Sequence, residues 1–368
     1  MRILHIDPDD MDSPVSGGDP VRTFEIYRRL AKRHDITVLT PSFARSTKEK
    51  IREGIRYVRI GRKYGRHNST YFISFYLAAP FAARRFDCDL LVEDLMPPTA
   101  ATITPLINPK KIIASVQWFW PKAWADQYKI PFHWYLPFGL KQYRHFIALT
   151  HRLKQELLKY NPRADIEVIP NGVTDHFLKQ PPQKGEFILY LGRIEDMQKG
   201  TDLLIQAFHT IVHKTNVKLV IAGDGIDFEK TKSTVRNLGM QDRIVFEGKV
   251  GMERKLDLLS RCLFVCIPSR IESFCMVALE AFACAKTIVF FDIPYMAFPH
   301  VDFAIKIRPF DIDQFASAML HLLNHPEKAE AFGEKARQYA LNCTWDSLAL
   351  AQEAFYKKVL TGNSKASR

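Results

Sequence analysis

Two series of short, almost entirely apolar segments constrain the fold of this 368-residue chain most strongly. Within each series, a helix-length amphipathic stretch separates most of these segments, a pattern that indicates parallel sheets covered on both faces. Sheets of this kind belong to doubly wound domains, so we predict an α/β chain with two Rossmann-like domains. The strand-like segments are 2–7, 36–40, 56–60, 89–94, 111–117, 145–150 and 166–170, then 187–192, 218–223, 243–248, 263–269 and 287–292.

The boundary between the predicted domains is the segment 171–186, NGVTDHFLKQPPQKGE, whose glycines and prolines are typical of a linker. The first domain is expected to span residues 1–170 and the second residues 187–345. Helical spacing continues in 344–360, after the last strand. We therefore expect a C-terminal helix within 346–368 that packs back on the first domain.

No apolar run reaches the roughly 18–20 residues that a membrane-spanning helix needs. The N-terminus turns acidic at once and lacks a secretory layout. The six cysteines form no Cys-x-x-Cys pair and lie mostly in apolar runs, which favours reduced, buried thiols. We expect a cytoplasmic protein.

The net charge of +12 is concentrated in the first domain, where residues 1–170 hold 27 Lys and Arg against 17 Asp and Glu. These cations do not form the dense block of a nucleic-acid tail, so no nucleic-acid partner is expected. Several instead flank the aromatic-rich segment 71–83, which suits an anionic membrane surface on the inner face of the membrane. A solvated basic face is the alternative. The flanking cations are Arg62, Lys63, Arg66, Arg84 and Arg85.

Doubly wound domains bind ligands at the carboxyl ends of their strands. Arg193 and Lys199 lie in such a place, on the loop 192–200, where two cations beside a helix start suit a diphosphate. An exposed charged loop is the alternative. Gly17 and Gly18 precede the helix after the first strand and would let backbone amides approach an anion, although a plain turn also explains them.

Glu272 and Glu280 are eight residues apart, in a loop and in the apolar helix that follows it. A carboxylate inside a helix as apolar as MVALEAFACA is costly unless it meets a partner. A ribose diol is one such partner, because a carboxylate accepts from two hydroxyls. Pairing with a neighbouring arginine is the alternative.

Four segments together resemble the retaining glycosyltransferases of family four, over nearly the whole chain and most strongly over 169–291. The resemblance implies the GT-B architecture, in which two Rossmann-like domains enclose a cleft, and a nucleotide-sugar donor. The segments are VIPNGV (168–173), LGRIEDMQKGTDLLIQAF (191–208), LVIAGDG (219–225) and PSRIESFCMVALEAFAC (268–284).

The resemblance also implies roles for individual residues. Arg193 and Lys199 would neutralise the diphosphate, Glu272 would face the reacting sugar, and Glu280 would hold the ribose. The other donor-binding residues it implies are Gly18 near the phosphates, Lys249 and Val250 near the base, and Phe274, Cys275, Met276 and Val277 around the distal phosphate and sugar. Asn171 and Gly172 would turn the hinge between the domains.

Three departures from the family pattern bear on mechanism. Gln117 stands where the family commonly has a histidine; it can hydrogen-bond to a sugar near the donor but cannot titrate. Cys275 replaces a glycine, which would narrow the donor pocket or weaken the enzyme. Ala285-Lys286-Thr287 replaces a Gly-x-Pro.

We expect neither a metal nor a cofactor apart from the substrate nucleotide-sugar, because Arg193 and Lys199 supply the counter-charge. Two Asp-x-Asp motifs, at 87–89 and 311–313, are interpreted as a strand boundary and a helix cap. The aromatic segment 118–138 suits core packing, sugar stacking or membrane contact.

The sequence therefore predicts a metal-independent, retaining hexosyltransferase in cell-surface glycan synthesis. The donor is a UDP-sugar, UDP-glucose first, and the acceptor is a hydroxyl of a lipid-linked sugar or polysaccharide. Alternatives are a GDP-mannose donor, nucleotide-sugar epimerisation, and a non-catalytic module that binds sugar or lipid.

Overall fold

The chain folds into two compact units, Met1–Asn171 with Trp345–Arg368, and Gly172–Thr344. The segment predicted as a linker therefore lies almost wholly in the second unit, where it contains the short helix α7. The computed structural model describes residues 1–13, 19–64, 70–95, 103–122, 125, 132–294, 296–298 and 300–362.

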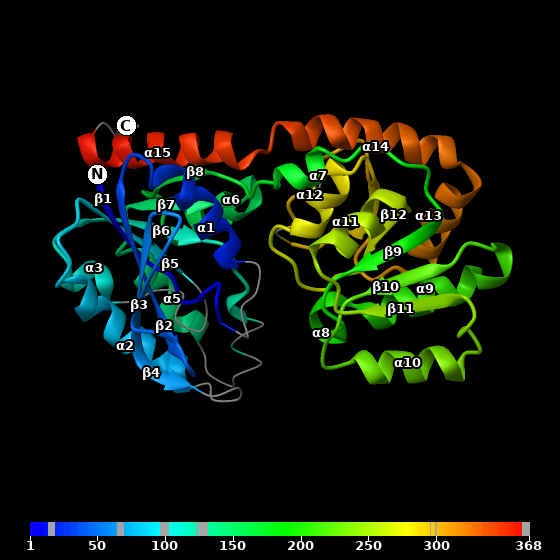
Figure 1. Ribbon diagram of the computed structural model, residues 1–368, viewed down its shortest axis with the longest axis horizontal. Helices are drawn as coiled ribbons and strands as arrows, with labels where there is room; N and C mark the ends of the chain where they lie inside the picture. The colour runs from blue at the N-terminus through cyan, green and yellow to red at the C-terminus, as the bar shows by residue number, and fades with distance from the viewer. Residues whose placement is uncertain are drawn as a thin grey trace. The chain divides into compact units, whose positions relative to one another are not determined.

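The first unit is built on an eight-stranded sheet in the order β3-β4-β2-β1-β5-β6-β7-β8 (Figure 1). Every pairing is parallel except that of β3 with β4. The inner strands are apolar because helices cover both faces. The strands are β1 (Arg2–Ile6), β2 (Asp35–Phe43), β3 (Glu49–Arg52), β4 (Ile55–Tyr64), β5 (Leu90–Asp94), β6 (Lys111–Val116), β7 (His145–Ala148) and β8 (Asp165–Val168).

The direction of each connection decides which face of this sheet a helix covers. From β4 onward the chain moves steadily toward β8, whereas α1 connects β1 to β2 in the opposite direction. Because such crossovers are right-handed, the helices between β4 and β8 share the face opposite to α1. The helices are α1 (Asp19–Leu30), α2 (Thr70–Ala83), α3 (Thr104–Ile107), α5 (Phe132–Leu140) and α6 (His151–Tyr160).

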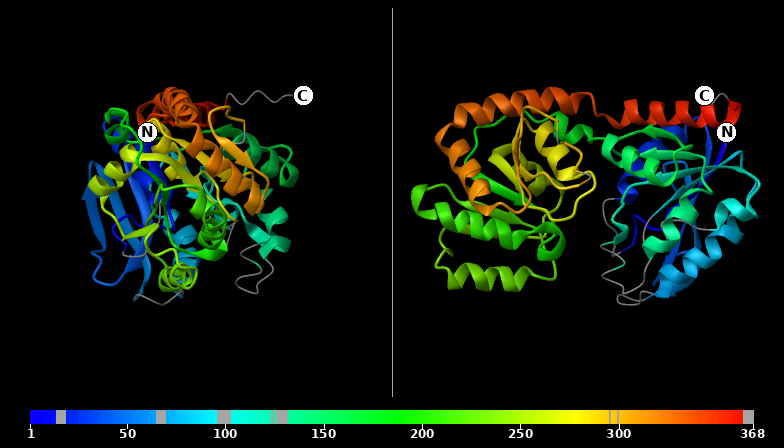
Figure 2. Two further views of the ribbon diagram at one scale, coloured as in Figure 1. Left: turned by 90° about the vertical axis from the view of Figure 1, so that its right-hand side faces the viewer. Right: turned by 180° about the vertical axis from the view of Figure 1, so that it is seen from behind.

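The C-terminal helix α15 (Trp345–Thr361) belongs to the first unit and runs beside α1 (Figures 1 and 2). The hydroxyls of Tyr27 and Tyr356 are 3.1 Å apart, and the buried Arg22 guanidinium donates to Gln352 Oε1 at 2.9 Å. Trp345 is fully buried at the start of the helix. The chain therefore completes the first unit only with its last helix.

The second unit carries a six-stranded, wholly parallel sheet in the order β11-β10-β9-β12-β13-β14. Its strands are β9 (Phe187–Leu191), β10 (Leu219–Ala222), β11 (Ile244–Gly248), β12 (Cys262–Ile267), β13 (Thr287–Phe291) and β14 (Ile305–Ile307). Its helices are α7 (Asp175–Leu178), α8 (Asp196–Lys199), α9 (Thr201–Ile211), the 3₁₀ turn Val212–Lys214, α10 (Phe228–Asn237), α11 (Met252–Arg261), α12 (Met276–Ala283), α13 (Ile312–Asn324) and α14 (Pro326–Leu341). The two sheets confirm the predicted pair of doubly wound domains.

Two edge strands, β3 and β14, lie outside the predicted set. β3, with the sequence EKIR, is antiparallel and mostly exposed, so it has no apolar run to mark it. β14 has only three residues and pairs with β13 alone. An edge strand needs fewer buried side chains than a central one, which removes the pattern on which its prediction depends.

Candidate functional site

The predicted donor-binding residues of the second unit lie at one edge of its sheet. Because all its strands are parallel, their carboxyl ends meet there. Arg193 follows β9, Lys249 follows β11 and Glu272 follows β12, while Glu280 lies in the helix α12 that begins after this last loop. The fold therefore assembles these positions from three separate strand-to-helix connections.

Lys199 and Glu272 form an ion pair across two of these loops, with 2.6 Å between Lys199 Nζ and Glu272 Oε2. Both side chains are largely buried, with 22% and 14% of their surface exposed. Burial alone would lower the pKa of the Lys199 ammonium, but the Glu272 carboxylate outweighs it and the pKa is raised. Lys199 therefore carries a positive charge at neutral pH, which a phosphate ligand requires.

Arg193 is the more exposed of the two predicted cations, with 63% of its side chain accessible. Its guanidinium donates to Gln198 Oε1 at 3.0 Å and lies 3.1 Å from Glu195 Oε2. Its positive charge repels that of the Lys199 ammonium, which offsets part of the rise in the Lys199 pKa. One partly buried and one solvent-facing cation on a single loop suit a diphosphate.

A glycine fixes the loop that carries Lys199. Gly200 follows α8 in the left-handed region, with φ of 64°. A Cβ at this position would come within 2.1 Å of the Pro268 carbonyl oxygen, so α8 rests directly on the end of β12 and only glycine fits. The Arg270 amide also donates to the Gln198 carbonyl oxygen at 2.9 Å. The two loops are therefore one rigid element.

Arg270 strengthens the same junction and was not among the predicted site residues. Its guanidinium donates to both carboxylate oxygens of Asp202, at 2.6 and 2.7 Å, and to the Asp196 carbonyl oxygen at 2.5 Å. Such a bidentate pair fixes both direction and distance. An arginine two positions before Glu272 was the only signal in the sequence, and its partner lies 68 residues away.

Cys275 precedes α12 with a left-handed backbone, φ 56° and ψ 76°. This region costs a residue with a side chain about 1–2 kcal/mol, which explains why glycine suits the position. The thiol is buried, and burial together with the nearby Glu272 carboxylate raises its pKa. Cys275 is therefore a neutral, bulky group beside the Lys199–Glu272 pair.

Of the residues predicted around the distal phosphate, Phe274 is anchored in the core. Its ring packs edge-on against Phe298, with centroids 5.4 Å apart. Met276 and Val277 form the first turn of α12. Their backbone amides lie where a helix favours an anion, and their contact with a phosphate stays a prediction.

Glu280 is 7% exposed, in the second turn of α12. Its Oε1 accepts a hydrogen bond from Lys255 Nζ at 2.6 Å. Burial raises the pKa of Glu280, and Lys255 limits the rise. Glu280 Oε2 is buried without a hydrogen-bond partner among the described residues. The partner of Glu280 is therefore a lysine from α11 and not the arginine considered in the sequence analysis, and it contacts one carboxylate oxygen.

Lys249 and Val250, the residues predicted near the base, lie between β11 and α11. Lys249 is exposed and Val250 half-buried. Gly248 before them has φ of 66°, which turns the chain at the strand end. Their contact with a base stays a prediction.

Gln117 directly follows β6 in the first unit and is buried. Its Nε2 donates to Asp94 Oδ2 at 2.8 Å, and its Oε1 has no hydrogen-bond partner in the described part of the chain. His5 Nε2 lies 3.2 Å from the other oxygen of Asp94. Asp94 was not predicted, although a carboxylate ending the apolar run LLVED was a usable signal.

Two neighbouring carboxylates of this edge ionise differently. Burial would raise the pKa of Asp94, but His5, Ser115 and Gln117 outweigh burial and lower it. Burial and the Asp94 charge raise the pKa of Asp7 well above its usual range. Folding therefore favours the charged form of Asp94 and the protonated form of Asp7. Gly18, predicted near the phosphates, lies outside the described residues.

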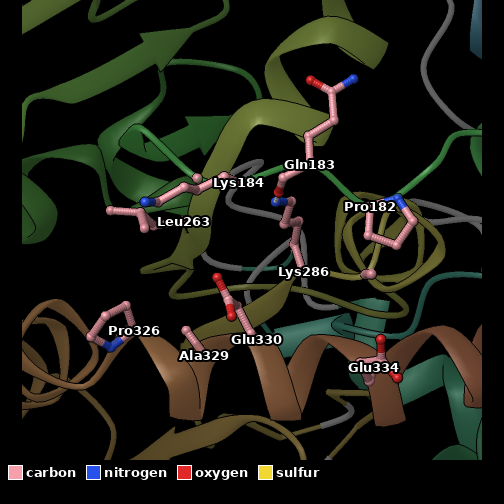
Figure 3. Close-up of a pocket in the computed structure, with 11 residues that line it drawn as sticks. Pro182, Gln183, Lys184, Leu263, Lys286, Pro326, Ala329, Glu330 and Glu334 are labelled. Carbon is pink, nitrogen blue, oxygen red and sulfur yellow. Dashed lines mark hydrogen bonds between the residues drawn. The ribbon is translucent and has the colours of Figure 1, made fainter.

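The second unit also contains a cavity of about 410 Å³ (Figure 3). It is bounded by the segment before β9 and by α14, and the buried Lys286 Nζ donates to the Gln183 carbonyl oxygen at 2.7 Å in its wall. Burial lowers the pKa of Lys286. None of the predicted donor-binding residues lines this cavity, so it is separate from the candidate site.

Both Asp-x-Asp motifs have structural partners. Asp87 and Asp89 pair with Arg2, and Asp311 caps α13 by accepting from the Gln314 amide at 2.9 Å. Across the residues that the structure describes, no group of three or more His, Cys, Asp or Glu is arranged to hold a metal ion. Metal independence stays a prediction.

Comparison with known proteins supports the resemblance seen in the motifs. Residues 16–177 match the protein family described as "Glycosyltransferase Family 4", and residues 174–339 match the family described as "Glycosyl transferases group 1". The phosphatidylinositol N-acetylglucosaminyltransferase gpi3 subunit of Schizosaccharomyces pombe is 27% identical over 256 residues, 66% of this chain and 55% of that protein. The chain spans about half the length of the curated relatives it matches.

Solved structures share the fold at low identity. Sucrose-phosphate synthase from Thermosynechococcus elongatus matches with a TM-score of 0.80 at 16% identity, covering 98% of this chain and 100% of that one. Anabaena Alr3699/HepE in complex with UDP-glucose matches with a TM-score of 0.75 at 16% identity, covering 97% and 100%. Since the two family descriptions follow one another along the chain and the fold is GT-B, as predicted, this chain belongs to glycosyltransferase family 4.

Proposed function

We propose that this protein transfers a hexose from a nucleoside-diphosphate sugar to an acceptor hydroxyl with retention of anomeric configuration. The observation that carries the proposal is the charged edge of the second unit. There the paired Lys199 and Glu272 lie on loops that Gly200 locks together, and α12 adds the buried Glu280. In this proposal Lys199 binds the diphosphate, Glu272 faces the sugar and Glu280 binds the ribose.

In the proposed reaction, the bond between the anomeric carbon and the diphosphate oxygen breaks, and a bond to the acceptor oxygen forms on the same face. The acceptor proton passes to the departing phosphate oxygen, so no separate base is required. The negative charge that develops on the diphosphate is stabilised by Lys199, Arg193 and the first turn of α12. Glu272 would face the reacting sugar.

We infer a UDP-sugar as donor, UDP-glucose first, with GDP-mannose as the alternative. The Anabaena structure of the same fold holds UDP-glucose, which supports a uridine nucleotide without fixing it for this chain. A thermal-shift panel of UDP, GDP and ADP tests the base, because a ligand that binds only the folded state raises its stability. No shift with any of the three would contradict the proposal.

A non-catalytic sugar- or lipid-binding module is the second candidate, favoured by Gln117 and Cys275 in place of the family's residues. Nucleotide-sugar epimerisation is the third. Incubation of the protein with the donor that shifts its unfolding separates them. Release of free nucleoside diphosphate indicates a transferase, an altered nucleotide-sugar indicates an epimerase, and an unchanged donor indicates a module. Proton NMR of a transfer product then gives its anomeric configuration.

The acceptor is proposed to be a lipid-linked sugar or a growing polysaccharide on the inner face of the membrane. One face of the first unit supports this. α2, α3 and α5 cover the same face of its sheet and expose large apolar side chains to solvent. These side chains are Leu77, Phe81, Leu106, Trp134, Tyr135 and Phe138. Of the helices described here, none has the length and apolarity to cross a membrane.

Cations lie at both ends of α2. Arg62 and Lys63 precede it and Arg84 and Arg85 follow it, all four exposed, while Arg66 lies outside the described residues. Each attracts an anionic lipid surface by about 1 kcal/mol. The name of the gpi3 subunit, an enzyme acting on phosphatidylinositol, gives a relative with a lipid acceptor.

Vesicle co-sedimentation tests this membrane contact. The protein is expected to pellet with vesicles rich in anionic lipid at low salt and to be released at high salt. Exchange of Arg84 and Arg85 for Gln should weaken pelleting, whereas exchange of the exposed Lys335 of the second unit should not. If the wild-type protein ignores these vesicles at low salt, the basic face is only solvated and a soluble acceptor becomes the better interpretation.

A further inference from the structure

Lys255 occupies an unusual place in the second unit. It lies in the first turns of α11, and its ammonium sits between an aromatic ring and a carboxylate. The distance from Nζ to the centroid of the Phe177 ring is 5.5 Å, and the distance to Glu280 Oε1 is 2.6 Å. Phe177 itself is 1% exposed. Both contacts restrict the direction from which the ammonium approaches Glu280.

The pair is poorly explained as a device for stability alone. Glu280 and Lys255 side chains are 10% and 23% exposed, and burying such a pair loses hydration that an apolar pair would not lose. The geometry also leaves Glu280 Oε2 buried with no hydrogen bond from any described residue. A buried carboxylate oxygen without a donor is costly, and native proteins seldom leave one without a functional reason.

We propose that Lys255 is a positioning residue that presents Glu280 Oε2 to a ribose hydroxyl of the nucleotide. The inference rests on the proposed function, since it needs a nucleotide at this edge. The terminal torsion of a glutamate is broad, so a carboxylate held by no partner rotates. The bond from Lys255 to Oε1 fixes that torsion, and the ammonium limits the rise in the Glu280 pKa that burial causes. Oε2 is then free to accept a hydrogen bond from a ribose hydroxyl.

The test compares nucleotides that differ only at the ribose. Calorimetric titration of the full chain with UDP, GDP and ADP first identifies the tightest binder. Its 2′-deoxy and 3′-deoxy forms are then titrated. For the wild type, loss of the hydroxyl that Glu280 accepts should weaken binding about tenfold, the size expected for a hydrogen bond to a charged group.

In Lys255→Met, the complete nucleotide should bind about tenfold more weakly, while the matching deoxy form changes by less than about twofold. Lys255→Arg, which keeps a cationic donor, should restore most of the affinity. Arg254→Met is the matched control on the same helix, because Arg254 makes only exposed pairs with Glu247 and Asp257 and should change neither titration.

Lys255→Met leaves a buried carboxylate without its cation and is expected to unfold more easily. Lys255→Met combined with Glu280→Gln removes both charges, so it provides a folded variant, and its affinity should also be insensitive to the ribose hydroxyl. Equal losses for the ribose and deoxy forms, or no loss at all, would overturn the proposal and leave the nucleotide site intact. A wild-type protein that binds none of the three nucleotides would instead overturn the proposed function, and this inference with it.

Discussion

At the carboxyl edge of the second unit's sheet, Lys199 and Lys255 each hold a carboxylate from another element at 2.6 Å. At the same edge of the first unit's sheet, Asp94 is held instead by Gln117 and His5. A lysine carries a compact charge on a flexible stem, so its ammonium can leave a carboxylate and bind a phosphate instead. Asp94 is buried, and among the described residues it accepts a hydrogen bond from the neutral amide of Gln117. The second edge therefore suits a charged ligand, and the first suits hydroxyls.

Removing a lysine from the second edge should give the largest effect. In Lys199→Ala, turnover is expected to fall about a hundredfold or more, the range found when a group that stabilises developing charge is lost. Arg193→Ala should cost less, because Arg193 is largely exposed. Steady-state kinetics measured as nucleotide release gives both values. The control is Lys335→Ala, an exposed lysine paired with Asp302. A loss below about tenfold in Lys199→Ala would remove the phosphate role from this residue.

A substitution at the edge of the first unit's sheet should instead change the stability of the protein. Asp94→Asn is expected to lower the free energy of unfolding at pH 7 by about 2–3 kcal/mol, because Gln117 loses a charged acceptor and His5 loses the carboxylate 3.2 Å away. The pKa of Asp94 is lowered on folding, so its contribution exists above the unfolded pKa and disappears as pH falls through the folded one. Urea unfolding at pH 7 and in acid measures the difference.

Asp7 should change the free energy of unfolding with pH in the opposite direction to Asp94. Its pKa is raised on folding, so its contribution is present below the unfolded pKa and is lost as pH rises toward the folded value. Asp7→Asn mimics the protonated form and should raise the free energy of unfolding at pH 8 by about 1 kcal/mol. If Asp7→Asn and Asp94→Asn shift stability in the same direction at that pH, folding does not shift the two pKa values in opposite directions.

Gln117→Ala should sharpen the difference between hydroxyl and phosphate recognition. We expect turnover to fall about tenfold, as for a lost substrate hydrogen bond, with a smaller change in affinity for the free nucleotide. The pH–rate profile of the wild type should lack an imidazole limb from this position, and Gln117→His should introduce one. A loss of nucleotide binding as large as the loss of turnover would show that Gln117 contacts the nucleotide.

Cys275→Gly should give the smallest effect on stability. Relief of the left-handed strain and the greater freedom of glycine in the unfolded chain act in opposite directions, so the free energy of unfolding is expected to change by less than about 1 kcal/mol. The informative measurement is the ratio of kcat/KM for two donor sugars of different size. That ratio should move toward the bulkier sugar; an unchanged ratio would remove Cys275 from the sugar pocket.

Sequence pattern predicted the central strands and the loop residues of the donor edge because both depend on local composition. Lys199 and Glu272 were singled out because they follow strand ends, and Glu280 because it is a carboxylate in an apolar helix; their roles stay predictions. Lys255 and Arg270 were not predicted because their partners lie 25 and 68 residues away in the sequence. From sequence alone, a single cation on an amphipathic segment is interpreted as a solvent-exposed side chain. The edge strands β3 and β14 were missed for a different reason, since they are short and bury few side chains, whereas the edge strands β8 and β11 contain apolar runs and were predicted.

The C-terminal helix has a consequence for how the protein is made. The second unit is one continuous stretch, Gly172–Thr344, and its two ends are tied together where the Val173 amide donates to the Cys343 carbonyl oxygen at 2.9 Å. It has every residue it needs before synthesis ends. The first unit does not, because α15, with the buried Trp345 and Tyr356, is translated after the whole second unit. On the ribosome, the segment made second is therefore the first that is able to complete its fold.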